Sequence, residues 1–312
     1  MGQKTNSNIL RLGLYENDWK SKYIENNKEE LSFFVYQDIE IKKYIDRFFK
    51  IYGLLIHRCN IIRTNDQIDI FIAYFSTLDS ISFINKLNSS ILTPTNFNSA
   101  SSILNKKLNK RIRFYSIINS KKIWYKQKYP KKIFFVAKHF VGKLLSSLNI
   151  FLGKKYKINF VLQNLNKSLS VRLKNSDALE FRKMVIQLRI YAKAKFFKEA
   201  INLFLIVLKR RSSTKLLAQF IALNLGNLKR HNYFINFIKR MFVLALKSNI
   251  STINGVKLKI KGRFNGAPRA RTKLIQIGNI PLQTFKSKID YNYAIAFTSN
   301  GTFGVQLWIS EK

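Results

Sequence analysis

The chain has 312 residues and a mass of 36.6 kDa, a length that suits two domains. Its 46% content of hydrophobic residues is enough for a substantial core and excludes wholesale disorder. Lysine and arginine (56 residues) outnumber the 16 acids, so the formal net charge is +40 and the natural partner is a polyanion.

Acids are missing from two long tracts, one between Asp79 and Asp177 and the other between Glu199 and Asp290. A membrane surface could also attract such basic tracts. They lack a clean amphipathic basic helix, however, and contain many aromatic residues of the kind usually buried, so nucleic acid is the favoured partner. The longest apolar runs, such as 201–208, fall far short of the roughly 20 residues that span a bilayer.

The first 30 residues are predicted to form a polar arm, with Lys4, Arg11 and Lys20 around Trp19. A helix is then expected over 38–52, because apolar residues recur there at helical spacing. Gly53 should end this helix as a C-cap glycine.

Two short apolar segments, 54–62 and 68–75, are predicted to pair as a β-hairpin, followed by a weak helix over 79–87. The run 157–163 alternates apolar and polar residues and predicts a further strand. Between them lies a basic tract that is rich in aromatic residues.

The basic residues of this tract are Lys106, Lys107, Lys110, Arg111, Arg113, Lys121, Lys122, Lys126, Lys128, Lys131 and Lys132. The interspersed aromatics are Phe114, Tyr115, Trp124, Tyr125 and Tyr129. Such a mixture can bind phosphates and stack on bases. A solvated, partly helical extension whose aromatics pack internally or on a neighbouring protein is equally consistent with this pattern.

Helical spacing returns over 177–208, where the presence of acids favours protein packing over RNA contact. Two more helices are predicted over 214–228 and 232–247. The second carries a stripe of aromatic and aliphatic residues that is expected to be buried.

The C-terminal stretch 256–309 contains four strand-like segments and a basic loop. Its first strand alternates apolar residues with lysines, namely Val256, Leu258 and Ile260 with Lys257, Lys259 and Lys261. One face should therefore pack while the other presents three ammonium groups. In the loop 262–271, two glycines and a proline fix the backbone, and Arg263, Arg269 and Arg271 suit bidentate contact with phosphate.

Four motifs follow one another here: Gly262-Arg263-x-x-Gly266-Ala267-x-x-Ala270-Arg271-Thr272, Pro281-Leu282, Ile289-Asp290-Tyr291 and Gly301-x-x-Gly304-Val305-x-x-Trp308-Ile309. The chain opens on Met1-Gly2-Gln3-Lys4, Arg11-Leu12-Gly13 and Trp19-x-Ser21-x-Tyr23. In this order, the motifs at both ends closely resemble those of small-subunit ribosomal protein S3, the universal small-subunit protein three. The middle of the chain is far less specific.

The resemblance implies an α+β fold, with an N-terminal KH-like domain of type II and a C-terminal α+β domain that contains a four-stranded sheet. Largely helical basic insertions interrupt this plan. The expected parts are an rRNA-contacting arm (1–30), the first part of the KH-like domain (31–88), a basic aromatic-rich insertion (89–153), the last KH-like strand (154–165), a helical insertion (166–212) and the C-terminal ribosomal protein domain (213–312). KH domains clamp a backbone through a Gly-x-x-Gly loop, but residues 73–82 contain no glycine, so capture of a single strand is not assigned to this unit.

The implied function is that of a structural constituent of the small ribosomal subunit, which binds rRNA in the head and lines the mRNA entrance channel. Its implied partners are small-subunit rRNA, mRNA and neighbouring head proteins, with no cofactor, membrane or small-molecule substrate. The expected rRNA contacts are Lys4, Arg11, Lys257, Lys259, Lys261, Arg263, Arg269, Arg271 and Lys273. The expected mRNA path consists of Lys229, Arg230, Lys239 and Arg240. Ile235 and Asn236 occupy positions that are arginine in bacterial relatives, which weakens the case for strand separation but not for a basic path.

No catalytic arrangement is visible. His57, His139 and His231 are scattered, and the sequence has neither a His-Glu-x-x-His motif nor a glycine-rich phosphate loop. Cys59 is the single cysteine, which excludes an internal disulfide. Asp290 is expected to make an internal hydrogen bond or a salt bridge to a loop arginine. An enzyme is therefore not expected.

An organellar RNA-processing or intron-splicing factor is the main alternative, although it would need an acidic metal-binding cluster. A membrane-peripheral scaffold is the third. The richness in Lys, Asn, Ile and Phe suggests AT-rich coding, and the family-like motif begins at residue 1. We therefore expect a mitochondrially encoded protein in the ribosome of the mitochondrial matrix, with a plastid or a bacterial cytoplasm as the alternative.

Overall fold

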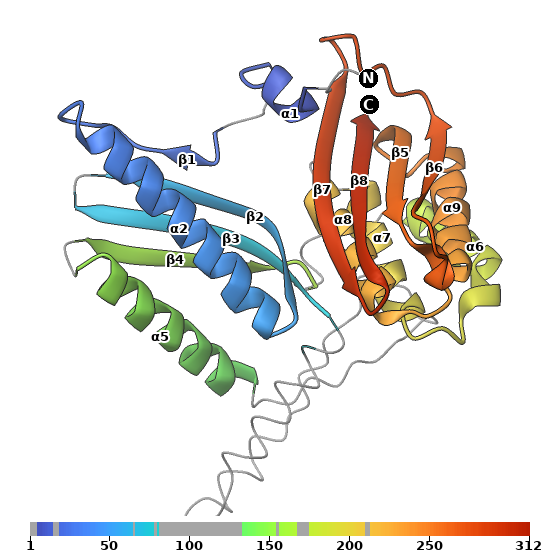
Figure 1. The fold of residues 1–312 in the computed structure, drawn as a ribbon, viewed down its shortest axis with the longest axis horizontal. Coiled ribbons are helices and arrows are strands. Elements are labelled where there is room, and N and C mark those ends of the chain that lie inside the picture. The colour runs from blue at the N-terminus through green and yellow to red at the C-terminus, as the bar shows by residue number, and fades with distance from the viewer. Residues whose placement is uncertain are drawn as a thin grey trace, which may run out of the picture. The chain divides into compact units, whose positions relative to one another are not determined.

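The computed structural model describes residues 5–14, 19–64, 66–77, 80, 133–153, 156–166, 175–209 and 213–312. The described residues within 1–20, 55–57 and 169–312 form one compact unit, and those within 21–54 and 58–168 form another (Figure 1). The helix predicted over 79–87, apart from Ser80, and the basic aromatic tract up to Lys132 lie outside the described residues.

A sheet of four strands in the order β1-β2-β3-β4 is the framework of the N-terminal half. The predicted hairpin consists of β2 (Leu54–Arg63) and β3 (Gln67–Ser76), and the Thr64 N–H donates to the Gln67 carbonyl at 2.9 Å in its turn. The short β1 (Ser21–Lys22) pairs parallel with β2. The strand predicted over 157–163 is β4 (Lys157–Asn164), which pairs parallel with β3.

Helix α2 (Glu30–Ile51) lies across this sheet (Figure 1), and α5 (Ile133–Phe151) packs against α2. Helix α2 begins at Glu30, before the predicted start at Asp38. The prediction missed its first turns because they are largely exposed and carry little apolar periodicity. Its end is as predicted, since Gly53 has φ +70° and donates to the Lys50 carbonyl at 3.0 Å. The two helices meet where Phe140 of α5 contacts the rings of Phe48, Phe49 and Tyr52.

A buried ion pair joins α2 to β2. The Arg63 Nε donates to Asp38 Oδ1 at 2.7 Å, and Arg63 Nη1 donates to Gln37 Oε1 at 2.8 Å. Both charged side chains are 3% exposed. Because a buried charge without its partner is costly, this pair fixes how the helix lies on the strand.

In the other unit, a run of helices precedes the C-terminal strands. They are α6 (Asn175–Gln187), the 3-10 helix η1 (Arg189–Tyr191), α7 (Phe197–Lys209), α8 (Thr214–Asn227) and α9 (His231–Lys247). Phe196 packs against Phe234 and Phe237 of α9, with ring centroids 4.9 and 5.2 Å apart. The apolar stripe of α9 is therefore core, as its spacing predicted.

The C-terminal sheet is antiparallel and has the order β6-β5-β8-β7. Its strands are β5 (Ile253–Gly262), β6 (Arg271–Gly278), β7 (Lys288–Thr298) and β8 (Gly301–Glu311). Helix α8 packs on β7 and β8, and α9 packs on β5 and β6, so one face of the sheet is covered (Figure 1). The fold is thus α+β with the predicted four-stranded C-terminal sheet.

The short helix α1 (Ser7–Leu10) docks on β7 from the far end of the chain. Asn8 pairs with the backbone of Tyr291, donating through Nδ2 to the carbonyl and accepting from the N–H through Oδ1, both at 2.7 Å. Part of the predicted polar arm is therefore tied to the sheet.

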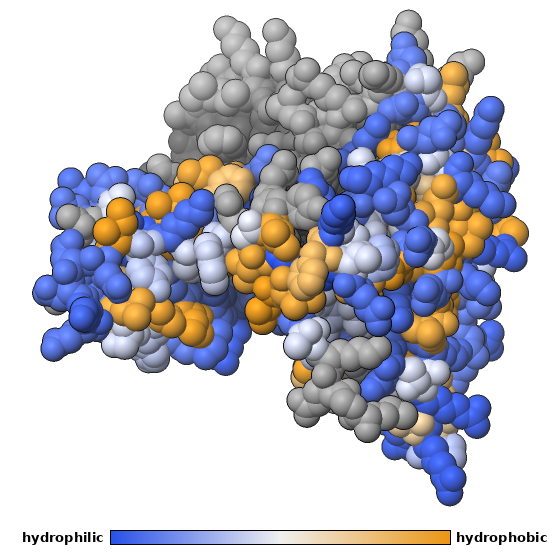
Figure 2. All heavy atoms as spheres, turned by 90° about the horizontal axis from the view of Figure 1, so that it is seen from above, coloured by the Kyte–Doolittle hydropathy of each residue, from blue (hydrophilic) through white to orange (hydrophobic). Residues whose placement is uncertain are grey.

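Hydrophilic side chains cover most of the face seen in Figure 2, with apolar ones in separate patches. Within the described ranges, none of the helices has both the length and the apolar character needed to cross a membrane.

Candidate nucleic-acid interface

The basic loop 262–271 turns sharply at Asn265 and Gly266, which have φ values of +53° and +78°. Glycine adopts this left-handed region freely and asparagine tolerates it, which explains the Asn-Gly pair at the 3-10 turn η2 (Phe264–Gly266). At Gly262, a Cβ atom would lie 2.2 Å from the Phe303 ring. The motif glycines therefore serve a backbone path that other residues would not allow.

The loop is anchored on the first residue of α9. The His231 N–H donates to Asn265 Oδ1, and the Asn265 N–H donates to His231 Nδ1, both at 3.1 Å. Phe264 and Phe303 pack beside this pair, with ring centroids 5.2 Å apart, and Phe303 also contacts the His231 ring. The loop is thus held rigidly by the helix and the sheet.

Arg263, Arg269 and Arg271 are all exposed on this anchored loop. Arg263 Nε donates to the Ala267 carbonyl at 2.8 Å, which holds its guanidinium close to the loop. Lys229 and Arg230, also exposed, immediately precede the helix residue that anchors the loop. Two predicted groups, the loop arginines and the first half of the mRNA path, are therefore brought to the same end of α9.

Lys273 belongs to this assembly in a supporting way. Its Nζ lies 4.7 Å from the centroid of the Phe264 ring and donates to Asn232 Oδ1. Since Lys273 pairs in register with the buried Ile260, its side chain leaves β6 on the face that the helices cover.

Lys257, Lys259 and Lys261 lie on the opposite, open face of the sheet, because their neighbours Val256, Leu258 and Ile260 are buried under the helices. The alternation predicted from sequence is confirmed. The three lysines therefore lie on the other side of the sheet from α9.

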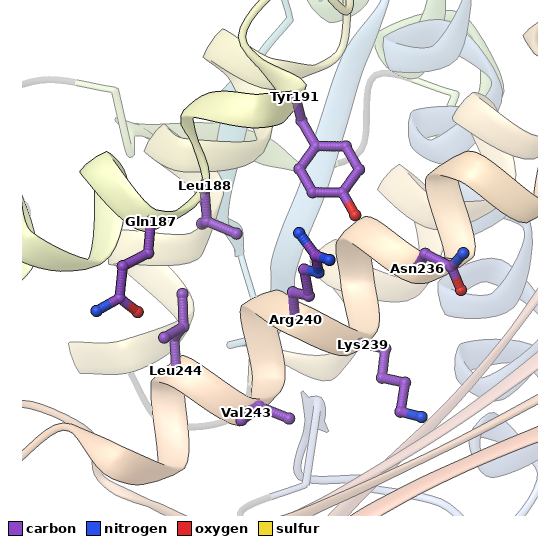
Figure 3. A pocket seen from close by; sticks show the side chains of 8 residues that line it. All are labelled: Gln187, Leu188, Tyr191, Asn236, Lys239, Arg240, Val243 and Leu244. Atoms are coloured by element: carbon purple, nitrogen blue, oxygen red, sulfur yellow. The ribbon is translucent and has the colours of Figure 1, made fainter.

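Lys239 and Arg240 are exposed farther along α9, beside a hollow of about 480 Å³ between this helix and the α6–η1 segment (Figure 3). The guanidinium of Arg240 lies 5.7 Å from the centroid of the Tyr191 ring. The hollow is lined by Gln187, Leu188, Tyr191, Asn236, Lys239, Arg240, Val243 and Leu244. Lys239 follows His231, the residue that anchors the loop, by about eight residues of α9, which corresponds to a helix rise of roughly 12 Å.

Arg11 was expected to contact rRNA, but the structure places it inside the protein, with 1% of its surface exposed. Its guanidinium donates to the carbonyls of Ser7, Leu282, Thr284 and Ser287 at 2.9–3.2 Å. These bonds occupy the fork that phosphate would need, so Arg11 is reassigned to holding α1 on the sheet. Lys4 lies outside the described residues.

Asp290 was expected to make an internal hydrogen bond or a salt bridge to a loop arginine, and the structure shows internal hydrogen bonds with Thr214 and Asn8. Its Oδ2 accepts from the N–H and the hydroxyl of Thr214, and its Oδ1 accepts from Asn8 Nδ2 at 3.4 Å. Burial raises the pKa of Asp290, while the bonds from Thr214 and Asn8 and the charge of Lys20 act in the other direction.

His231 is 3% exposed, and burial lowers its pKa. The charge of Lys273 adds to this effect, whereas hydrogen bonding to Leu225 and Asn265 opposes it. The Nδ1 atom accepts a hydrogen bond, so it carries no proton in this arrangement. In the part of the chain that the structure describes, no three or more His, Cys, Asp or Glu side chains gather as metal ligands would.

Rigidly held arginines, with further cations at the same helix end, define a basic surface of the kind that contacts phosphate. The family "Ribosomal protein S3, C-terminal domain" matches residues 227–309, which run from the end of α8 to β8 and include the whole loop.

Among related proteins, small ribosomal subunit protein uS3 of Karelsulcia muelleri is 31% identical over 200 residues, which is 62% of this chain and 83% of that protein. The uS3c protein of Euglena longa is 26% identical over 311 residues and is covered completely. The uS3c protein of Physcomitrium patens is 40% identical over 105 residues, or 45% of its own length. The chain belongs to the small ribosomal subunit protein uS3 family.

Sequence reasoning missed the residues that hold the surface together, above all His231, Asn265 and Tyr191. An Asn-Gly pair does signal a left-handed turn, so the special backbone at Asn265 could have been found. Its partner could not, because the two residues are 34 positions apart.

Proposed function

We propose that this chain is a structural constituent of the small ribosomal subunit, where it binds rRNA in the head and lines the mRNA entrance channel. The observation that carries the proposal is the coincidence of the family match at 227–309 with the anchored, arginine-bearing loop. The role is one of binding rather than catalysis. Its mechanism is neutralisation of phosphate charge by groups held in a fixed shape.

The rRNA contacts in this proposal are the three loop arginines Arg263, Arg269 and Arg271, with Lys257, Lys259 and Lys261 on the open sheet face. Lys4 also remains in the set. Lys273 stays in the set as well, and it supports the loop through its contacts with Asn232 and the Phe264 ring. Lys229, Arg230, Lys239 and Arg240 form the proposed mRNA path along α9, and the neighbouring head proteins complete the set of partners.

For the N-terminal half we propose a type II KH-like domain, built from residues 31–88 and 154–165. The order α2, β2, β3, β4 within these residues, with β3 parallel to β4, supports this assignment. Residues 89–153 and 166–212 are then insertions, and 213–312 is the C-terminal domain. The ribosome is organellar or bacterial, as the relatives are, and AT-rich coding favours a mitochondrial one.

The decisive experiment follows the chain on a magnesium-containing sucrose gradient of a lysate, with and without RNase. Comigration with small-subunit rRNA that is lost after RNase treatment is expected. Migration as a light, RNase-insensitive species would contradict the ribosomal assignment.

The contribution of the loop is tested by Arg263→Glu combined with Arg271→Glu, which reverses two phosphate-facing charges and should reduce incorporation into small subunits. The matched control is Lys193→Glu with Lys195→Glu, an equal charge change at two exposed positions between η1 and α7. Equal incorporation of both double variants would remove the loop from the proposal.

A further inference from the structure

The open face of the C-terminal sheet places aromatic side chains beside the lysine column. In register, Lys257 lies opposite Trp308, which lies opposite Tyr291 on the next strand. Likewise Lys259 lies opposite Gln306, and Gln306 lies opposite Tyr293. Residues paired in this way share a face, so the lysines of β5 and the rings of β7 and β8 belong to one surface.

Tyr293 reaches across this surface from β7 towards β8. A Cβ atom built on Gly304 of β8 would be 3.4 Å from Tyr293 Oη and 3.5 Å from its Cε2, so the ring extends over the backbone of the neighbouring strand. The residue is nevertheless 50% exposed. The contact with the glycine is made by the hydroxyl and one edge of the ring, and half of the residue's surface stays open to solvent.

The reach of Tyr293 brings it towards the cations. Strands β7 and β5 are separated by β8, a distance of about 10 Å between backbones. The hydroxyl of Tyr293 extends over Gly304, which pairs in register with Lys261. A planar group stacked on this ring would therefore lie next to ammonium groups. Farther along the aromatic side of the face, Lys257 lies 5.8 Å from the centroid of the Trp308 ring, and that ring is 5.0 Å from Tyr291.

The charge of the surface selects the partner. Strands β5 to β8 contain two acids, Asp290 and Glu311. Asp290 pairs with the buried Ile309 and so lies on the covered face, and Glu311 is the last residue of β8. Three lysines without an acid between them complement a polyanion, and exposed rings complement bases that are free to stack.

We propose that this face binds unpaired RNA, with a base stacked on Tyr293 and the adjoining phosphates contacting Lys259 and Lys261. In a duplex the faces of the bases are already stacked and unavailable, so the site discriminates against paired RNA. The inference rests on the proposed ribosomal function only for the source of the RNA. The stacking site itself is a property of the sheet.

The test uses the full chain and a labelled single-stranded oligoribonucleotide, with excess unlabelled duplex RNA present to occupy the remaining basic surface. Tyr293→Leu removes the ring and should weaken binding about tenfold, whereas Tyr293→Phe keeps the ring and should bind like the parent chain. Lys259→Gln with Lys261→Gln should lower the slope of log affinity against log salt by about 1.4, because two phosphate contacts are lost. Equal affinity of the Leu and Phe variants would overturn the stacking site.

A second arm identifies the occupant inside the subunit. A photoreactive benzoylphenylalanine placed at position 293 should crosslink to rRNA and give an RNase-sensitive product. A crosslink to a neighbouring protein would overturn the inference and assign the face to protein docking. The oligoribonucleotide assay does not depend on incorporation into the ribosome, so a failure to comigrate with small subunits on the gradient would count against the ribosomal role and not against the stacking site.

Discussion

His231 and Asn265 are joined by two reciprocal hydrogen bonds between backbone and side chain. Each donates its own N–H to the other's side chain at 3.1 Å, so the first residue of α9 and the left-handed turn of the loop are closed by one reciprocal pair. The asparagine acts as a cap for a helix to which it does not belong. Because the rings of Phe264 and Phe303 pack on the His231 side of the pair, the loop position depends on it directly.

Replacing Asn265 by alanine should lower the free energy of unfolding of the C-terminal unit by about 2 kcal/mol. Roughly half of this comes from the lost cap and half from holding alanine at φ +53°, a left-handed conformation that asparagine tolerates better than alanine does. Urea unfolding of the purified chain measures the change. Asn265→Gly is the matched variant. Because glycine relieves the backbone strain but supplies no cap, it should recover only the part of the unfolding free energy that is lost through the backbone conformation.

The His231 pair should also make the loop sensitive to acid. The pKa of His231 is lowered in the folded state. The stability that this histidine contributes is therefore complete above its unfolded-state pKa of about 6.5 and is lost as pH falls through its folded-state pKa. Unfolding midpoints measured from pH 7.5 down to pH 5 should fall more for the parent chain than for His231→Gln. If the two profiles run parallel, His231 does not titrate on unfolding.

Asp290 should behave in the opposite way. Burial raises its pKa, so the stability it contributes is present below the unfolded value of about 3.9 and is lost as pH rises through the folded value. Asp290→Asn cannot ionise and should become progressively more stable than the parent chain as pH rises from 4. Each unit of pKa shift corresponds to about 1.4 kcal/mol. Thr214→Val, which removes the hydroxyl that stabilises the carboxylate, should steepen the loss.

Arg11→Met should destabilise the C-terminal unit by about 3 kcal/mol, because buried carbonyls lose their donors while the apolar stem is retained. The salt dependence of RNA binding should not change, since the guanidinium does not face solvent. Lys261→Gln is the comparison: it should leave stability nearly unchanged and reduce the salt slope by about 0.7. A reduced slope for Arg11→Met would restore it as a phosphate contact.

Local patterns allowed much of the fold to be predicted. The alternation of Lys257 and Leu258 identified both faces of β5, and Gly53 identified the end of α2, because each signal lies within a few residues. The start of α2 was missed because exposed turns have no apolar period. The same limit applies to the site. The exposed loop arginines follow from composition, but the burial of Arg11 does not, since it is set by carbonyls some 276 residues away.

The docking of α1 on β7 has a consequence for synthesis of the chain. Asn8 and its partner Tyr291 are 283 positions apart, so at 5–20 residues per second the partner is made roughly 15 to 60 s later. During that interval the leading segment has no strand to bind. The edge of β7 can be closed only after nearly all of the other elements have been made, so this contact belongs to the last steps of folding.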